Sequence, residues 1–166
     1  PTSTSTGEKP RRAVVLTGAT GFLGRELLWR LITSLPSEYD IVCLVRERGE
    51  SRSRGTSPPP AALSPAEAAQ LAERRLQDVL DEGAPLPRED ARRARVHAQP
   101  GDITRPRLGL DEAAFSALSA RTHEIYHGAA TVRFDLPLHE ARHTNVDGTR
   151  EILALAQAAH AAGTLR

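Results

Sequence analysis

The sequence is poor in cysteine, lysine and aromatic residues. Its one cysteine, Cys43, excludes an intramolecular disulfide and is consistent with the reducing environment of the cytoplasm. No apolar run approaches the roughly 20 residues that a membrane-spanning helix needs, and the polar opening residues lack the apolar core of a signal peptide. We therefore expect a cytoplasmic protein with no transmembrane segment.

An excess of either charge is lacking too. The formal net charge is +1, so we expect neither nucleic acid nor an anionic membrane as a partner. Apolar residues make up 39% of the chain and charged residues 26%, which is typical of a soluble globular domain. Residues 1–11 predict a disordered lead-in, and the Ser-, Arg- and Pro-rich stretch 47–62 predicts a flexible insertion in a domain that spans 12–166.

Short apolar runs alternate with helical patterns along that domain. Strands are predicted at 13–17, 41–45, 95–99 and 123–127, and helices at 25–35, 65–82, 111–118 and about 137–162. A capping box, Ser64 to Glu67, predicts the start of the second helix. Strands that alternate with helices predict an α/β fold, a Rossmann-like doubly wound parallel sheet, of which strands 1–4 are present.

A glycine-rich loop joins the first predicted strand to the first helix. It reads Thr-Gly-Ala-Thr-Gly-Phe-Leu-Gly over 17–24. Glycine permits a tight turn and a close approach of backbone to a pyrophosphate, and the following helix presents free N–H groups to an anion. This context predicts a dinucleotide site, and a glycine-rich turn without a ligand is the alternative. The residues expected at the cofactor are Thr17, Gly18, Thr20, Gly21, Phe22, Leu23 and Gly24.

The residue after the second strand indicates which dinucleotide binds. NAD sites usually carry an acid there for the ribose 2′-hydroxyl, whereas this sequence has Arg46. A guanidinium pairs bidentately with a 2′-phosphate, so we expect NADP(H), with Arg25 as a second candidate ligand. Two alternatives stay open: both arginines are solvated surface charges, or Glu47 serves as the acid of an NAD site.

Five motifs, in this order, carry a family resemblance. They are the glycine loop (17–24), Leu-Val-Arg (44–46), Gly-Asp-Ile-Thr-Arg-Pro-Arg-Leu-Gly-Leu (101–110), Ile-Tyr-His-Gly-Ala-Ala-Thr-Val-Arg-Phe-Asp (125–135) and Asn-Val-Asp-Gly-Thr-Arg-Glu-Ile-Leu (145–153). From Arg12 onward, without 47–62, the chain resembles the N-terminal portion of extended short-chain dehydrogenases/reductases. The nearest resemblance is to the fatty acyl-CoA reductases, which share the male-sterility-type NAD(P)-binding domain, and to the thioester-reductase domains of carboxylic acid reductases and peptide synthetases.

This resemblance implies an NADPH-dependent oxidoreductase of lipid metabolism. Its substrate would be an acyl-CoA or acyl-carrier-protein thioester, which hydride transfer would reduce to an aldehyde or alcohol. The resemblance also implies that Gly101, Asp102 and Ile103 hold the adenine, with Asp102 accepting from its amino group and Ile103 packing on the ring, although Asp after Pro-Gly commonly caps a turn. Asn145 would help to organise the site. Small residues would lie along the nicotinamide ribose: Gly128, Ala129, Ala130 and Thr131.

The catalytic pair of this family is absent from the sequence. The reductases use Tyr-x-x-x-Lys, but the residues four places after Tyr39 and Tyr126 are Cys43 and Ala130, and the one lysine is Lys9. We therefore expect no catalytic residue in this chain, which alone should be inactive. The Tyr and Lys would lie in a C-terminal remainder of the enzyme, and without it an apolar sheet edge would stay open.

Two other functions remain open. A nucleotide-sugar epimerase or dehydratase shares the glycine loop and the Asn-Val-x-Gly-Thr element, but it would usually have an acid in place of Arg46. A non-catalytic NADP-sensing protein would need neither the tyrosine nor the lysine.

Four further patterns are interpreted structurally. His139 to His143 spells the His-Glu-x-x-His of zinc proteases, but no third ligand is indicated, so we expect no metal. Cys43 should be an inert core thiol. Phe22 and Trp29 should pack against the sheet, and the cluster at 92–95, Arg-Arg-Ala-Arg, should be a solvated face.

Overall fold

The computed structural model describes residues 11–46, 63–82 and 85–166. Its sheet has four parallel strands in the order β3-β2-β1-β4. The strands are β1 (Arg12–Thr17), β2 (Tyr39–Val45), β3 (Val96–Pro100) and β4 (Thr122–His127). The helices are α1 (Phe22–Ser34), α2 (Pro65–Asp81), α3 (Glu112–Ser119), α4 (Leu138–Arg142) and α5 (Gly148–Ala161), with 3-10 turns η1 (Ala91–Arg95) and η2 (Pro106–Gly109) and a π-helical segment η3 (His143–Asp147). The parallel order confirms the predicted Rossmann-like α/β fold.

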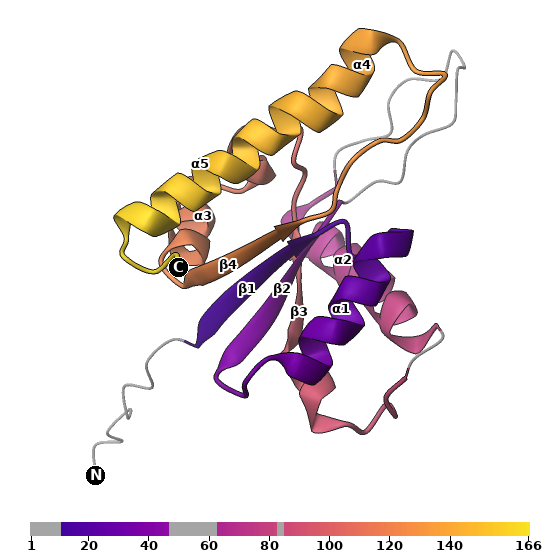
Figure 1. The fold of residues 1–166 in the computed structure, drawn as a ribbon, viewed down its shortest axis with the longest axis vertical. Helices are drawn as coiled ribbons and strands as arrows, with labels where there is room; N and C mark the ends of the chain where they lie inside the picture. Colours follow the sequence, from indigo (N-terminus) through magenta and orange to yellow (C-terminus); the bar gives the residue numbers. More distant parts are fainter. Residues whose placement is uncertain (1–10, 47–62, 83–84) are drawn as a thin grey trace.

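Helices cover both faces of the sheet (Figure 1). One layer holds α1 and α2, and the other holds α3 and α5. Alternate residues of β1 face the two layers: Val14 and Leu16 join the core under α1 and α2, whereas Ala13 and Val15 join the core under α3 and α5. Every residue of β2 is buried. Burial on both faces explains why these strands are apolar without polar alternation.

The predicted insertion at 47–62 and residues 1–10 of the predicted lead-in lie outside the described residues. Arg11, the last residue assigned to that lead-in, belongs instead to the fold. Its Nε lies 2.8 Å from a carboxylate oxygen of Asp40, and its guanidinium also donates to the carbonyl of Ser37.

One helix begins where its sequence predicts, and another predicted helix is divided in the structure. The capping box of α2 is confirmed, because Ser64 Oγ accepts from the Glu67 N–H and the Glu67 carboxylate accepts from the Ser64 N–H at 2.8 Å. The single helix predicted at about 137–162 is instead divided into α4, η3 and α5. A π-helical segment of this kind interrupts the regular ladder and often marks a functional site.

The prediction for Phe22 was wrong, while that for Trp29 is confirmed. Phe22 is 99% exposed because it is the first residue of α1, which begins past the carboxyl end of β1. The helix contacts the core only from Leu27 onward, so Trp29 is buried and Phe22 is not.

The prediction that the arginine cluster at 92–95 is a solvated face was wrong for Arg93 and Arg95, whereas Arg92 is exposed. Arg95 is only 8% exposed and donates to the carbonyls of Ile32 and Leu35, where α1 ends. Arg93 is similarly buried and donates to the Leu80 carbonyl at the end of α2. Burial is tolerated because the terminal nitrogens of both guanidinium groups donate to carbonyls that the helix ends leave free, although Arg95 Nε has no hydrogen-bond partner among the described residues.

Candidate dinucleotide site

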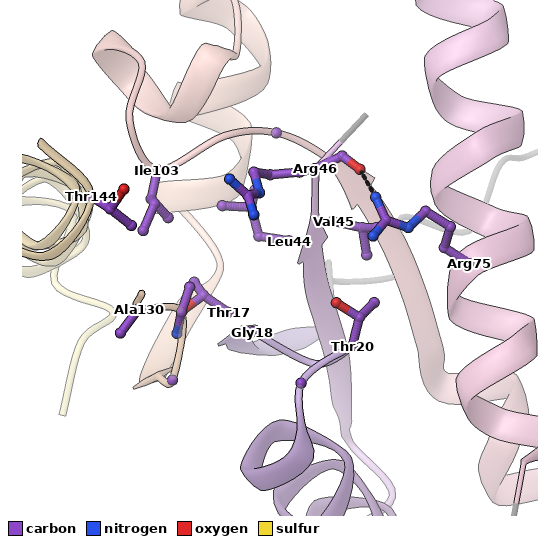
Figure 2. A pocket seen from close by; sticks show the side chains of 14 residues that line it. Thr17, Gly18, Thr20, Leu44, Val45, Arg46, Arg75, Ile103, Ala130 and Thr144 are labelled. Atoms are coloured by element: carbon purple, nitrogen blue, oxygen red, sulfur yellow. Dashed lines mark hydrogen bonds between the residues drawn. The ribbon is translucent and has the colours of Figure 1, made fainter. Parts of the chain in front are cut away.

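A pocket of about 200 Å³ lies at the carboxyl ends of the strands (Figure 2). The strand order places β2 on one side of β1 and β4 on the other, so the chain crosses over in opposite directions from this point and leaves a crevice. The lining residues are Thr17, Gly18, Thr20, Gly21, Leu44, Val45, Arg46, Arg75, Gly101, Ile103, Gly128, Ala129, Ala130 and Thr144.

The glycine loop is packed too closely for side chains at two positions. Gly18 has a φ of +76°, and a Cβ there would lie 2.6 Å from the carbonyl carbon of Gly128. A Cβ on Gly24 would lie 1.9 Å from the Gly18 carbonyl oxygen. Any larger residue would therefore push the loop away from β4 or α1 away from the loop.

The N-terminus of α1 faces this loop without a side chain to cap it. No side chain of the described residues forms a capping hydrogen bond at Gly21, and the first turn holds no acidic residue. Free N–H groups and the positive end of the helix dipole suit an anion. The tight glycine turn and the uncapped helix thus fit a pyrophosphate.

Thr17 and His127 join the ends of β1 and β4. The Thr17 hydroxyl lies 2.7 Å from His127 Nδ1 and accepts from the Ala129 N–H at 3.2 Å. His127 Nε2 lies 3.2 Å from the hydroxyl of Thr149 in the first turn of α5. Burial lowers the pKa of His127 below its usual value, because the charged imidazolium loses solvation there.

Two arginines reach the pocket from neighbouring elements. Arg46 follows the end of β2 and is exposed, and Figure 2 shows its side chain extending over the pocket toward Ile103. Arg75 approaches from α2 and donates to the Arg46 carbonyl at 2.7 Å. Arg25, the second arginine predicted at the cofactor, forms an ion pair with Glu82 and does not line the pocket.

In the loop after β3, Ile103 lines the pocket and Asp102 does not. Ile103 is buried, and a Cβ on Gly148 of α5 would lie 2.8 Å from its terminal methyl. One carboxylate oxygen of Asp102 accepts from both the N–H and the hydroxyl of Thr104. Asp102 therefore caps a turn, which is the alternative that the sequence left open.

Asn145 lies in η3 and holds the loop that follows β4. Its amide oxygen accepts from the Thr131 N–H at 2.8 Å, and its amide nitrogen donates to the Thr131 carbonyl at 2.9 Å. Thr131 is buried by this arrangement and does not line the pocket, whereas Ala129 and Ala130 do. Asn145 thus acts on the loop, which lies against the pocket, and not on the pocket directly.

The residues predicted at the cofactor agree in part with the residues that line the pocket. Predicted residues that line the pocket are Thr17, Gly18, Thr20, Gly21, Arg46, Ile103, Gly128, Ala129 and Ala130. Predicted residues that do not line it are Phe22, Leu23, Gly24, Arg25, Asp102, Thr131 and Asn145. Residues that the sequence reasoning missed are Leu44, Val45, Arg75 and Thr144, whereas Gly101, which the resemblance implies at the adenine, does line the pocket. Leu44 and Val45 lie within the Leu-Val-Arg motif, whereas Arg75 and Thr144 carry no local signal.

The His-Glu-x-x-His pattern does not assemble a metal site in the described ranges. His143 Nδ1 lies 3.6 Å from a carboxylate oxygen of Asp147, and His139 Nε2 lies 4.0 Å from Glu140. Across 11–46, 63–82 and 85–166, no three His, Cys, Asp or Glu side chains are grouped so as to hold a metal ion. In the same part of the chain no helix combines the length and apolarity needed to cross a membrane.

Comparison with known proteins agrees with this geometry. Residues 16–57 and 61–165 match the NAD-binding family described as male sterility protein. The chain is 38% identical over 155 residues to isonitrile lipopeptide synthase of Streptomyces coeruleorubidus, covering 90% of this chain and 9% of that protein. It is 35% identical over 145 residues to fatty acyl-CoA reductase 1 of Homo sapiens, covering 87% of this chain and 25% of that protein.

A solved structure shows the same arrangement of elements. The terminal R domain from the myxalamid PKS-NRPS biosynthetic pathway matches with a TM-score of 0.69 and 36% identity, covering 90% of this chain and 32% of that domain. The chain thus spans about a third or less of these relatives. Because the family match covers nearly the whole described fold and includes the glycine loop, the chain belongs to the male sterility protein family of NAD-binding domains, whose cofactor is a nicotinamide dinucleotide.

Proposed function

We propose that this chain is the NADPH-binding portion of a reductase that transfers hydride to an acyl thioester. The substrate would be a fatty acyl-CoA or an acyl-carrier-protein thioester, and the product an aldehyde or alcohol. Support comes from relatives named as a fatty acyl-CoA reductase and as a reductase domain of a peptide-synthetase pathway. NADPH would supply the hydride for the thioester carbonyl.

The observation that carries the choice of NADPH is the pair of arginines at the end of β2. Arg46 and Arg75 both line the pocket, and the Arg75 side chain binds the Arg46 backbone. Two guanidinium groups beside the ribose position favour a 2′-phosphate, which an NAD site with an acidic residue would repel. This pair also weighs against the epimerase alternative.

The other pocket residues would bind the remaining parts of the cofactor. The uncapped end of α1 and the glycine loop would bind the pyrophosphate. Ile103 would pack against the adenine, and the Gly128–Ala130 backbone would lie along the nicotinamide ribose, where the absence of large side chains permits close contact. These assignments place the two halves of the cofactor on opposite sides of β1.

The catalytic acid would come from the remainder of the parent protein. The sequence contains no Tyr-x-x-x-Lys, and the relatives are several times longer than this chain. We propose that the remainder supplies the proton donor and most contacts with the acyl group. We also propose a cytoplasmic location, since the one cysteine is free.

The proposal is tested by measuring NADPH and NADH binding by calorimetry. Arg46→Ala and Arg75→Ala should each weaken NADPH binding by about 1–3 kcal/mol, the scale of a lost charge-assisted hydrogen bond, and should leave NADH binding nearly unchanged. Arg74→Ala is the matched control, because Arg74 is the neighbouring exposed arginine of α2 and does not line the pocket. Failure of the folded protein to bind either nucleotide would refute the dinucleotide site, and equal loss of NADPH and NADH binding would refute the phosphate role.

A further inference from the structure

His127 lies at the centre of a hydrogen-bond chain that joins three elements. On one side its Nδ1 lies 2.7 Å from the hydroxyl of Thr17, at the end of β1. On the other side its Nε2 lies 3.2 Å from the hydroxyl of Thr149, in α5. The chain continues at both ends, because Thr17 accepts from the Ala129 N–H and Thr149 donates to the Asn145 carbonyl at 2.7 Å.

The two ends of this chain decide which nitrogen of His127 carries the proton. The Asn145 carbonyl can only accept, so the Thr149 hydroxyl donates its one hydrogen to this carbonyl. The same hydroxyl must therefore accept a hydrogen bond from His127 Nε2. His127 therefore carries its proton on Nε2, which leaves Nδ1 as an acceptor for the Thr17 hydroxyl. Thr17 can then accept from the Ala129 N–H with a free lone pair. Every donor in the chain has one acceptor, and only one tautomer satisfies all of them.

The same hydrogen bonds also hold both ends of the loop that lines the pocket. Ala129 is held at one end through Thr17, and Thr131 is held at the other end by the paired hydrogen bonds of the Asn145 side chain. Ala130 lies between these two fixed residues and lines the pocket with Ala129. The position of this loop relative to the glycine loop thus depends on the contacts that His127 makes with both β1 and α5.

We propose that His127 is a positioning residue: as the Nε2–H tautomer it links β1 to α5 and thereby holds the Ala129–Thr131 backbone in place along the cofactor. The inference rests on the proposed function, since it assigns this backbone to the nicotinamide half of NADPH. His127 itself does not line the pocket, so its effect passes through Thr17 and Thr149.

The test measures the dissociation constant of NADPH with Thr149→Val and Thr149→Ser in the full-length protein that carries this chain. Valine keeps the shape of threonine and removes the acceptor of His127 Nε2–H, so NADPH binding should weaken about three- to twelvefold, the scale of a net hydrogen bond. Serine keeps the hydroxyl and should bind within about twofold of the wild type. Thr149 is only half-buried, so neither change should prevent folding.

Thr33→Val is the matched control. The Thr33 hydroxyl donates to the carbonyl four residues earlier, that of Trp29, as Thr149 does to that of Asn145, but Thr33 lies outside the pocket network. This variant should bind NADPH as the wild type does. In a second arm, His127→Phe should weaken binding, and adding Thr149→Val to it should weaken binding by less than about twofold more, because both changes break the same chain.

The outcomes separate this inference from the function on which it rests. Wild-type-like affinity in Thr149→Val, or equal losses in Thr149→Val and Thr149→Ser, would overturn the positioning role while Arg46→Ala still tests the cofactor. Fully additive effects of His127→Phe and Thr149→Val would overturn it as well. A folded wild-type protein that binds no NADPH would overturn the proposed function and this inference together.

Discussion

At the scale of single residues, position in the sheet decides the chemistry of a side chain. Cys43 lies in the middle of β2 and has no exposed surface. Burial raises the pKa of its thiol from 9.0 to about 12, because the thiolate would lose its solvation. Only the thiolate is a nucleophile, so the folded protein holds this cysteine in its unreactive form.

We therefore expect Cys43 to resist alkylation until the protein unfolds. At pH 8.5 iodoacetamide should modify the native protein far more slowly than the urea-unfolded protein, as measured by mass spectrometry. Since the folded pKa lies above the unfolded value, this group stabilises the fold fully below about pH 9, and its contribution is lost as the pH rises toward about 12. Rapid alkylation of the native protein would contradict the burial of β2.

At the scale of elements, each helix depends on how its ends are satisfied. The N-terminus of α2 is closed by its own residues, Ser64 and Glu67. The C-terminus of α1 is closed from a distance by Arg95, which donates to the carbonyls of Ile32 in the last turn, Leu35 at the C-cap and Pro36 just beyond it. The N-terminus of α1 is left open toward the pocket. Two helix ends are thus used for stability and one is left available for an anion.

Ser64→Ala tests the local cap. Alanine keeps the helix propensity but removes the oxygen that accepts from the Glu67 N–H, so the free energy of unfolding should fall by about 1 kcal/mol. Urea denaturation followed by circular dichroism measures the change. Ser116→Ala is the control, because Ser116 is an exposed serine inside α3, and this change should be neutral or slightly stabilising. Equal effects of the two changes would argue against the cap.

At the scale of the whole molecule, β4 is an edge strand of the described sheet. In the described part of the chain β4 pairs only with β1. A groove runs beside it, lined by Ile125, Leu153 and Leu165, and Leu153 is 56% exposed. After α5 the chain turns back toward this side, where the Arg166 N–H donates to the His123 carbonyl at 3.1 Å. One backbone hydrogen bond thus joins the end of the described chain to β4.

We expect a longer piece of the parent protein that continues past Arg166 to be more stable than residues 1–166. A further strand along β4 would pair its free backbone groups and cover Leu153 and Leu165, adding about 2–4 kcal/mol to the free energy of unfolding. Urea midpoints of the two pieces measure the difference. Leu153→Ser should lower the stability of the longer piece more than that of the shorter one. Equal midpoints would show that this side of the sheet needs no further strand.

Much of the fold was predictable because its signals are local. The apolar runs of β1 and β2, the glycine loop between β1 and α1, and the cap at Ser64 each involve residues close together in the sequence. These neighbours interact in any compact structure, so their pattern determined the parallel α/β architecture and indicated a pocket at the carboxyl ends of the strands. The same reasoning predicted that Arg46, which directly follows β2, lies at this pocket.

Contacts between distant residues could be decided only by tertiary structure. Arg75 shows no pattern of its own, and it reaches the pocket because α2 packs beside the end of β2. In the sequence Arg95 has the pattern of a surface charge, and only the packed structure shows that it binds the end of α1. Asp102 does not line the pocket because its carboxylate accepts from Thr104 in a turn. By itself the sequence determined the fold class, the glycine loop and the arginine after β2. Which side chains share the pocket, and which tautomer of His127 holds its loop, depend on packing between segments that no short-range pattern records.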